Sequence, residues 1–225
     1  MSLFNCKLFF LLFAFAFVLP ETPVSAQQQQ PAHQWALVPV ADGFDFPVGK
    51  PNGDGFYRSR GLRFKSPRHL GEDWNGNGGG DSDLGAPTYA AAHGLVTYAA
   101  DAKGAWGKVV IVRHAFREPT LGKMLCCQTL YSHLDRIDVK LGQIVKRGDQ
   151  VGTIGTGNGR YPAHLHFELH FNIDVNCGQQ GIEKNPRNYG NPTAFIQRYR
   201  RLPVENRKAK GPVGGFLPYK GTEGM

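Results

Sequence analysis

The segment His164–Leu169 constrains the fold most, because its polar and apolar residues alternate strictly. On a β-strand, side chains alternate between two faces, so His164, His166 and Glu168 share one face while three apolar residues take the other. On a helix, a step of two residues turns through roughly 200° and would separate the two histidines. The pattern predicts a half-buried strand whose polar face carries chemistry. Two strand histidines are more often surface residues than metal ligands, so a metal site needs support from elsewhere in the chain.

Short segments rich in β-branched and aromatic residues follow one another through the middle of the chain, separated by glycine-containing turns. No helical pattern of real length precedes Pro192, after which Thr193–Arg201 is predicted to form a short helix. The sequence therefore predicts an all-β fold, with mostly antiparallel strands in a sandwich or a partly open barrel. The predicted strands are Gly61–Phe64, Gly94–Ala99, Lys108–His114, Leu125–His133 and Gln150–Ile154.

The two ends of the 225-residue chain differ in composition from its middle. Lys7 precedes an apolar run from Leu8 to Leu19, and the small residues Val24-Ser25-Ala26 suit a signal peptidase. This run is shorter than the ~20 residues that cross a bilayer, so no stable membrane span is expected after processing. We predict an exported protein, periplasmic or extracellular, with a signal peptide (1–26), a flexible leader (27–45), one domain (46–200) and a basic, flexible tail (201–225).

The chain is basic, and its formal net charge of +8 survives removal of residues 1–26, which hold one lysine and one glutamate. A basic exported protein is attracted to anionic surfaces such as cell-wall polymers, although solubility alone explains the charge equally well. The most basic segment, Arg198–Lys210, has little aromatic interleaving. Nucleic-acid binding is therefore not expected.

Three cysteines would remain after processing: Cys126, Cys127 and Cys177. Adjacent cysteines on a strand point to opposite faces, so at most one of the first two is well placed to pair with Cys177. The chain has no Cys-x-x-Cys motif, which argues against a structural zinc site built from thiolates.

His69 and Asp73 are candidates for further metal ligands. Gly71 between them and the glycine-rich sequel argue against a helix, and on a straight strand the pair would lie about 13 Å apart, too far for one ion. We expect the chain to bend here, with Gly71 permitting the bend. A solvated loop with an unrelated histidine and aspartate is the alternative for this segment alone. Zinc in a hydrolase takes three protein ligands and keeps one open position, and His69, Asp73 and either His164 or His166 would supply that set.

Other residues suit supporting roles. His133 and the unused histidine of the pair are then free to act as base or hydrogen-bond donor, and Glu168 can fix the tautomer of a histidine. The glycine-rich loop at 155–159 lacks the ending of a phosphate-binding loop and more plausibly shapes a cleft wall. His170 continues the polar face but is too distant to bind the same ion, and we assign it to structure or surface.

Three motifs in order resemble the lysostaphin-type (LytM-like) zinc metalloendopeptidases: His-x-Gly-x-Asp at 69–73, Tyr-Ser-His-Leu at 131–134 and His-Leu-His-Phe-Glu at 164–168. The resemblance runs from about Arg68 to Leu169. It implies a β-rich fold with a narrow groove, a single Zn²⁺ per chain and cleavage of peptide bonds in bacterial peptidoglycan. It also implies that His69, Asp73 and His166 bind the zinc and that His133 and His164 are the two catalytic histidines.

The resemblance has departures. Ala163 stands where the family usually has proline, and the segments 75–83 and 116–127 are longer than expected. All five metal and catalytic positions are intact, which argues against the chain being one of the inactive members of the family. We therefore predict an exported zinc endopeptidase acting on peptidoglycan stem or bridge peptides, with D-alanyl to diaminopimelate cross-links favoured because a basic protein attracts their carboxylates. The alternative is a zinc-binding, non-cleaving module that recognises wall peptides or activates a partner amidase.

Overall fold

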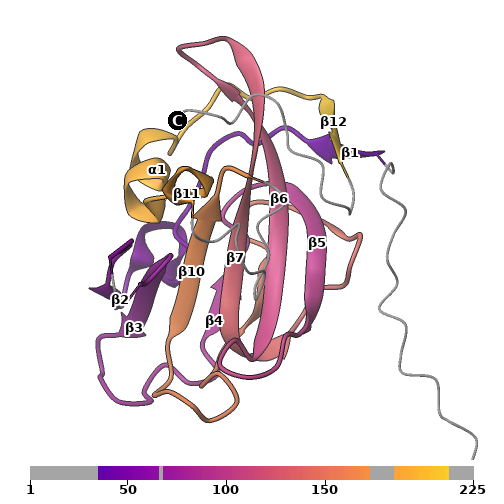
Figure 1. Ribbon diagram of the computed structural model, residues 1–225. Coiled ribbons are helices and arrows are strands. Elements are labelled where there is room, and N and C mark those ends of the chain that lie inside the picture. The colour runs from indigo at the N-terminus through magenta and orange to yellow at the C-terminus, as the bar shows by residue number, and fades with distance from the viewer. Residues whose placement is uncertain (1–34, 66–67, 173–184, 213–225) are drawn as a thin grey trace, which may run out of the picture.

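The computed structural model describes residues 35–65, 68–172 and 185–212, which form a mostly antiparallel β-structure with one short α-helix (Figure 1). The strands are β1 (Trp35–Pro39), β2 (Phe56–Arg60), β3 (Glu72–Gly76), β4 (Pro87–Tyr89), β5 (Gly94–Asp101), β6 (Lys108–Glu118), β7 (Lys123–Ile137), β8 (Ile144–Val145), β9 (Gln150–Ile154), β10 (Leu165–His170), β11 (Tyr189–Gly190) and β12 (Lys208–Pro212). The helix α1 spans Pro192–Arg198, and single helical turns lie at Gly49–Gly53 and Pro186–Asn188.

The larger sheet runs in the order β2-β3-β10-β7-β6-β5-β8, and β4, β9 and β11 join it beside this path. Among the described residues its strands form an open sheet and not a closed barrel. The all-β class, the mostly antiparallel pairing and the short C-terminal helix predicted from the sequence are confirmed.

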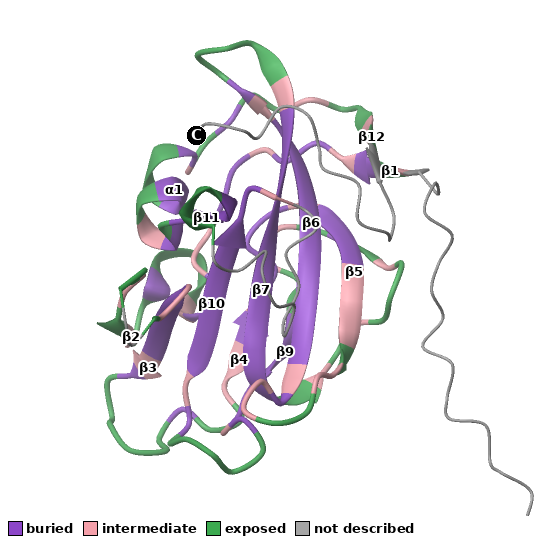
Figure 2. Cartoon of the chain, in the orientation of Figure 1, coloured by how far each residue is buried: buried purple, intermediate pink, exposed green. Residues whose placement is uncertain are grey.

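The long strands β6 and β7 form the centre of the sheet, and both faces of this hairpin are buried over most of its length (Figure 2). Cys126 packs with Val38 and Leu95 on one face, whereas Cys127 belongs to the main core on the other. The adjacent cysteines thus face opposite sides, as strand geometry requires. Burial raises the pKa of the Cys127 thiol, and Cys177 lies outside the described residues.

Strand β7 changes one of its neighbours at His133. Ser132 pairs with His166 of β10, whereas Leu134 pairs with Ile154 of β9. The backbone of His133 between them has φ +63°, a left-handed conformation that non-glycine residues rarely adopt. Such a conformation costs free energy and persists only where the surrounding structure enforces it. This bend aims the His133 side chain differently from its strand neighbours.

Helix α1 covers one end of the larger sheet through aromatic contacts. Asn191 caps its N-terminus, accepting a hydrogen bond from the Ala194 amide at 2.9 Å. Phe195 packs edge-on against Phe44 and Phe116, with ring centroids 4.9 and 5.6 Å apart. The helix is therefore held by core packing and not by helical propensity, since it is only seven residues long.

The two ends of the described chain pair with each other, which the sequence did not predict. Strand β1 pairs antiparallel with β12, and Val38 of β1 is buried against the larger sheet. Residues 35–39 and 208–212 are therefore strands, although we expected a flexible leader and a flexible tail there. Pairing between such distant segments has no local sequence signal. The expected signal peptide lies outside the described residues, among which no helix is long and apolar enough to cross a bilayer.

Candidate metal centre

The irregular hairpin formed by β2 and β3 carries two of the predicted ligands. In its register Arg60 lies opposite Asp73, and further along Arg63 and His69 exchange two backbone hydrogen bonds of 2.6 and 2.8 Å. The strand expected at Gly61–Phe64 was wrong, because only this single bridge forms there and the regular strand lies earlier in the chain. Irregular, glycine-containing pairing of this kind is not readable from local alternation.

The chain bends at Gly71, as expected, and this bend brings the ligand atoms of His69 and Asp73 together. A Cβ atom at Gly71 would lie 2.4 Å from the carbonyl oxygen of Phe167 in β10. Glycine is therefore required here because the two backbones approach closely, and not because of an unusual φ angle.

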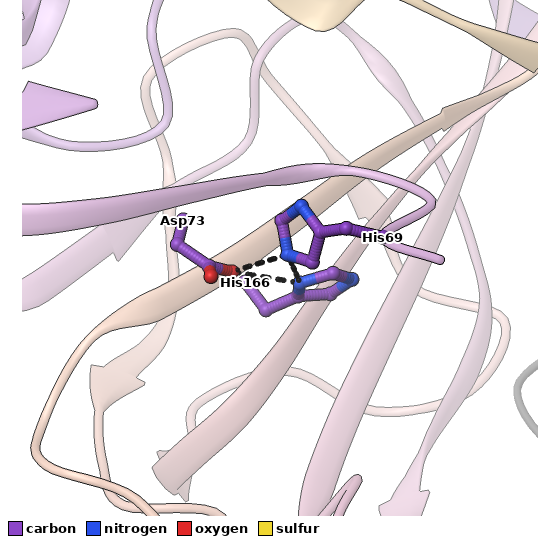
Figure 3. Close-up of side chains that lie close together, drawn as sticks. All are labelled: His69, Asp73 and His166. Atoms are coloured by element: carbon purple, nitrogen blue, oxygen red, sulfur yellow. Dashed lines mark hydrogen bonds and ion pairs between the residues drawn. The ribbon is translucent and has the colours of Figure 1, made fainter. Parts of the chain in front are cut away.

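His69, Asp73 and His166 converge on one point (Figure 3). His69 Nε2 lies 2.8 Å from Asp73 Oδ1 and 3.1 Å from His166 Nδ1, and His166 Nδ1 lies 2.9 Å from Asp73 Oδ1. Among the described residues, this is the one group of three or more histidine, cysteine or acidic side chains with metal-binding geometry. Two of the three side chains are buried and His69 is half-buried.

The outer hydrogen bonds of the two histidines fix which nitrogen faces this point. His69 Nδ1–H donates to the Gly61 carbonyl at 2.9 Å, and His166 Nε2–H donates to Glu168 Oε1 at 2.9 Å. When both rings are neutral, as metal binding requires, the inward nitrogens present lone pairs beside the Asp73 carboxylate. Tetrahedral zinc with ligand bonds of 2.0–2.1 Å needs donor atoms about 3.3 Å apart, close to the observed separations. The donor set therefore fits zinc.

The electrostatics of the three residues favour a bound cation. Burial lowers the pKa of His166, but its hydrogen bonds to Asp73 and Glu168 outweigh burial and raise the pKa to about 9. Burial raises the pKa of Asp73, but hydrogen bonds from His166 and His69 hold it well below its usual range. The three side chains thus stabilise a positive charge beside the ionised Asp73 carboxylate. A bound metal ion would supply such a charge.

His164, which precedes β10, lies at the edge of this group. Its Nδ1–H donates to the Pro162 carbonyl at 2.8 Å, and its Nε2 lies 3.7 Å from Asp73 Oδ1. The bond to Pro162 leaves Nε2 unprotonated in the neutral ring. The backbone of His164 is anchored by donating its amide to Gly155 at 3.2 Å.

His133 lies beside His164, with ring centroids 4.8 Å apart. Its backbone amide and its Nδ1–H both donate to the Trp106 carbonyl, at 2.9 and 3.3 Å. Burial, and then the neighbouring imidazoles of His166 and His164, lower the pKa of His133 to about 3. His133 is therefore neutral at physiological pH, with Nε2 as an acceptor. All five residues that the sequence singled out are brought together.

Strand β10 is buried on both faces, and the expectation of a half-buried strand was wrong. Its polar face is satisfied internally, because His170 Nε2–H donates to Glu168 Oε2 at 2.6 Å and Gln128 donates to His170 Nδ1 at 3.1 Å. His170, which we assigned to structure or surface, is fully buried behind the metal centre. Alternation shows which residues share a face but not whether that face is covered.

Two aromatic residues near the centre were missed by the sequence analysis. The Tyr161 ring lies 4.9 Å from that of His133 and 5.7 Å from that of His164, and the Trp106 ring lies 5.9 Å from that of His166. The available signal for Tyr161 was an aromatic residue three positions before His164 and two positions after the loop 155–159, which was expected to shape a cleft wall.

An antiparallel sheet with three converging metal donors and two adjacent histidines is an arrangement typical of the metallopeptidase class. Residues 69–177 match the model of Peptidase family M23. Lipoprotein NlpD of Yersinia enterocolitica is 30% identical over 105 residues, a match that covers 47% of this chain and 90% of that relative. The chain belongs to peptidase family M23, which confirms the resemblance found in the sequence.

Other relatives are much longer than the matched segment. Peptidoglycan DD-endopeptidase ShyB of Vibrio cholerae is 35% identical over 92 residues, covering 38% of this chain and 18% of ShyB. Cell division protein DipM of Caulobacter vibrioides is 34% identical over 87 residues, covering 39% and 13%. The chain thus spans less than a fifth of the length of the first curated relatives it matches. The structure of the antimicrobial peptidase lysostaphin from Staphylococcus simulans is 22% identical, covers 64% of this chain and 50% of that one, and has a TM-score of 0.45.

Proposed function

We propose that this protein is a zinc-dependent endopeptidase that cleaves peptide cross-links of bacterial peptidoglycan. The observation that carries the proposal is the placement of two further histidines, His133 and His164, beside three converging metal donors. Membership of family M23 supports the reaction class, and the naming of ShyB as a peptidoglycan DD-endopeptidase supports the substrate class.

In this proposal His69 Nε2, Asp73 Oδ1 and His166 Nδ1 hold a single zinc ion. When bound, zinc supplies Lewis acidity, which polarises a peptide carbonyl and makes water more acidic. Glu168 holds the His166 ring through its hydrogen bond to Nε2 and keeps Nδ1 directed inward.

In this proposal the two remaining histidines, His133 and His164, accept and donate protons during the reaction. In the neutral ring of each residue Nε2 is an acceptor, because Nδ1–H is engaged by a backbone carbonyl. One of them accepts a proton from the attacking water. The other takes up a proton from solvent and donates a hydrogen bond to the oxygen on which negative charge develops. The carbonyl contacts fix both rings in orientation before substrate arrives.

We further propose that the protein is exported through the signal peptide expected over residues 1–26 and acts in the periplasm or outside the cell. This part of the proposal rests on the charged, apolar and small-residue pattern of the N-terminal sequence. The partners are then the stem or bridge peptides of the wall.

The test is digestion of purified, cross-linked peptidoglycan by the zinc-loaded protein, with new amino termini identified by mass spectrometry. Cleavage should stop on chelation, return on zinc addition and be absent from the His133→Ala variant. No new termini with the zinc-loaded protein, together with stimulation of a wall amidase, would instead establish the non-cleaving alternative.

A further inference from the structure

The arm of the hairpin that faces the metal ligands is strongly basic. Residues 55–71 contain five basic side chains and no acidic one: Arg58, Arg60, Arg63, Lys65 and Arg68. All five are exposed, and they lie between the start of β2 and the first metal ligand. The basic charge is therefore concentrated next to the metal centre as well as in the C-terminal segment.

The register of this hairpin places two of the arginines directly opposite metal ligands. Arg60 is the partner of Asp73, and Arg63 is the partner of His69. Residues directly opposite each other in an antiparallel pair direct their side chains to the same face, with Cβ atoms about 4.5–5.5 Å apart. Arg60 and Arg63 therefore share the face on which Asp73 and His69 meet.

The pairing is irregular between Arg58 and Arg60, and the side chains on either side of the irregularity go to different faces. Arg58 donates to the buried Glu72 at 2.9 Å, on the face opposite the metal ligands. Ser59 lies 2.5 Å from Asn75 Oδ1, on the face of Asp73. In a bulge of this kind two successive residues oppose one partner, which keeps Ser59 and Arg60 together on the metal face.

We propose that Arg60 and Arg63 form a carboxylate-binding subsite that selects peptides with a free carboxylate next to the bond to be cleaved. The proposal rests on the function proposed above and names its substrate class. An exposed guanidinium offers a planar pair of donors that matches a carboxylate bidentately. No described acidic residue forms an ion pair with Arg60, so this guanidinium is available to the substrate. Uncharged glycine bridges offer no partner for it.

The first test measures binding without cleavage. Two uncross-linked stem tetrapeptides are titrated into the zinc-loaded protein by calorimetry, one with a free side-chain carboxylate on its diamino acid and one with that group amidated. We expect the carboxylate form to bind about tenfold more tightly, and Arg60→Gln and Arg63→Gln each to remove most of that preference. The preference should also shrink in high salt.

The matched control is Lys123→Gln, which removes the same charge from an exposed position at the start of β7. That hairpin end lies far from β2 in Figure 1. The Lys123→Gln variant should keep the full preference for the carboxylate peptide. The zinc content and the thermal midpoint of the arginine variants should match those of the parent protein.

The second test uses cross-linked dimers of the same two peptides. The arginine variants should raise KM about tenfold on the carboxylate dimer, with little change in kcat and no change on the amidated dimer. Cleavage of both dimers with equal KM by the parent protein would overturn the subsite and leave the endopeptidase proposal standing. A binding preference that depends on Arg60 without any cleavage would overturn the endopeptidase proposal and leave the subsite. Equal loss of preference in Lys123→Gln would show a general charge effect and overturn the subsite.

Discussion

His170 Nε2 lies 2.6 Å from Glu168 Oε2, while the other oxygen of the same carboxylate accepts the hydrogen bond of His166. Burial raises the pKa of Glu168, but hydrogen bonds from His166 and His170 outweigh it and lower the pKa to about 2. The carboxylate is therefore ionised, and it strengthens His166 as a metal ligand. We predict that Glu168→Gln, which keeps the shape and removes the charge, weakens zinc binding about 10- to 100-fold, measured by competition with a chelator.

His170 is predicted to act on the metal centre only through Glu168. His170→Gln should weaken zinc binding by less than Glu168→Gln does, and the double variant should be no weaker than Glu168→Gln alone. His114→Gln is the control, because His114 is equally buried but bonds to His93 and Thr129 instead. Additive losses in the double variant would mean that His170 acts independently of Glu168.

Substitutions of a metal ligand and of a catalytic histidine should differ in their effect on zinc content. His166→Ala is predicted to lose both zinc and activity, because it removes one of three donors. His133→Ala should retain stoichiometric zinc and lose activity by at least ~100-fold, the usual scale of acid–base catalysis. Metal analysis of the purified variants beside the peptidoglycan assay distinguishes the two. A His166→Ala protein that still held zinc and cleaved would refute the ligand assignment.

Gly157 is predicted to be sterically required beside His133. A Cβ atom there would lie 2.9 Å from the Ala105 carbonyl oxygen and 3.1 Å from His133 Nδ1. Gly157→Ala should lower kcat/KM about tenfold or more while leaving the zinc content unchanged, because it displaces the His133 ring or the loop. Gly159→Ala is the matched control, since Gly159 also has a positive φ but its Cβ would meet nothing within 4 Å. Equal effects of the two substitutions would show that backbone strain alone is responsible.

His114 is predicted to make the fold sensitive to mild acid. Burial, the largest effect, lowers its pKa to about 4, although its hydrogen bond to the His93 carbonyl acts in the opposite direction. The unfolded chain, with a histidine pKa near 6.5, binds more protons between these values. The contribution of His114 is therefore fully present above pH 6.5 and is lost as the pH falls toward 4, by up to about 3 kcal/mol.

Urea unfolding of the parent protein and of His114→Gln at pH 4.5 and pH 7 measures this contribution. The parent should lose more free energy of unfolding between the two pH values than the variant does. An identical pH dependence in both proteins would assign the acid sensitivity to other groups.

The sequence predicted those parts of the site that depend on local pattern. The alternation at His164–Leu169 identified the strand face that carries His166 and Glu168, and the order of the three motifs identified all five central residues. The bend at Gly71 followed from distance alone, since His69 and Asp73 could not share an ion on a straight strand. What the sequence predicted correctly was local geometry and which of these side chains lie together.

The features that the sequence missed depend on contacts between distant segments. Nothing in Trp35–Pro39 indicates that its partner is Lys208–Pro212, and nothing near His170 indicates that Gln128 covers it. The irregular pairing that sets Arg60 beside Asp73 is also a tertiary property, because it depends on how β2 is aligned with β3.

The change of neighbour at His133 has a consequence for amide hydrogen exchange. The His133 amide donates to the Trp106 carbonyl and to neither β9 nor β10, although residues on both sides of it lie within the sheet. Its exchange therefore requires only that the segment around Trp106 move away, whereas exchange at Leu134 or Ser132 requires the sheet to open. A single backbone proton thus reports how often the segment around Trp106, whose ring lies 5.9 Å from that of His166, moves away from the metal centre, independently of any substrate.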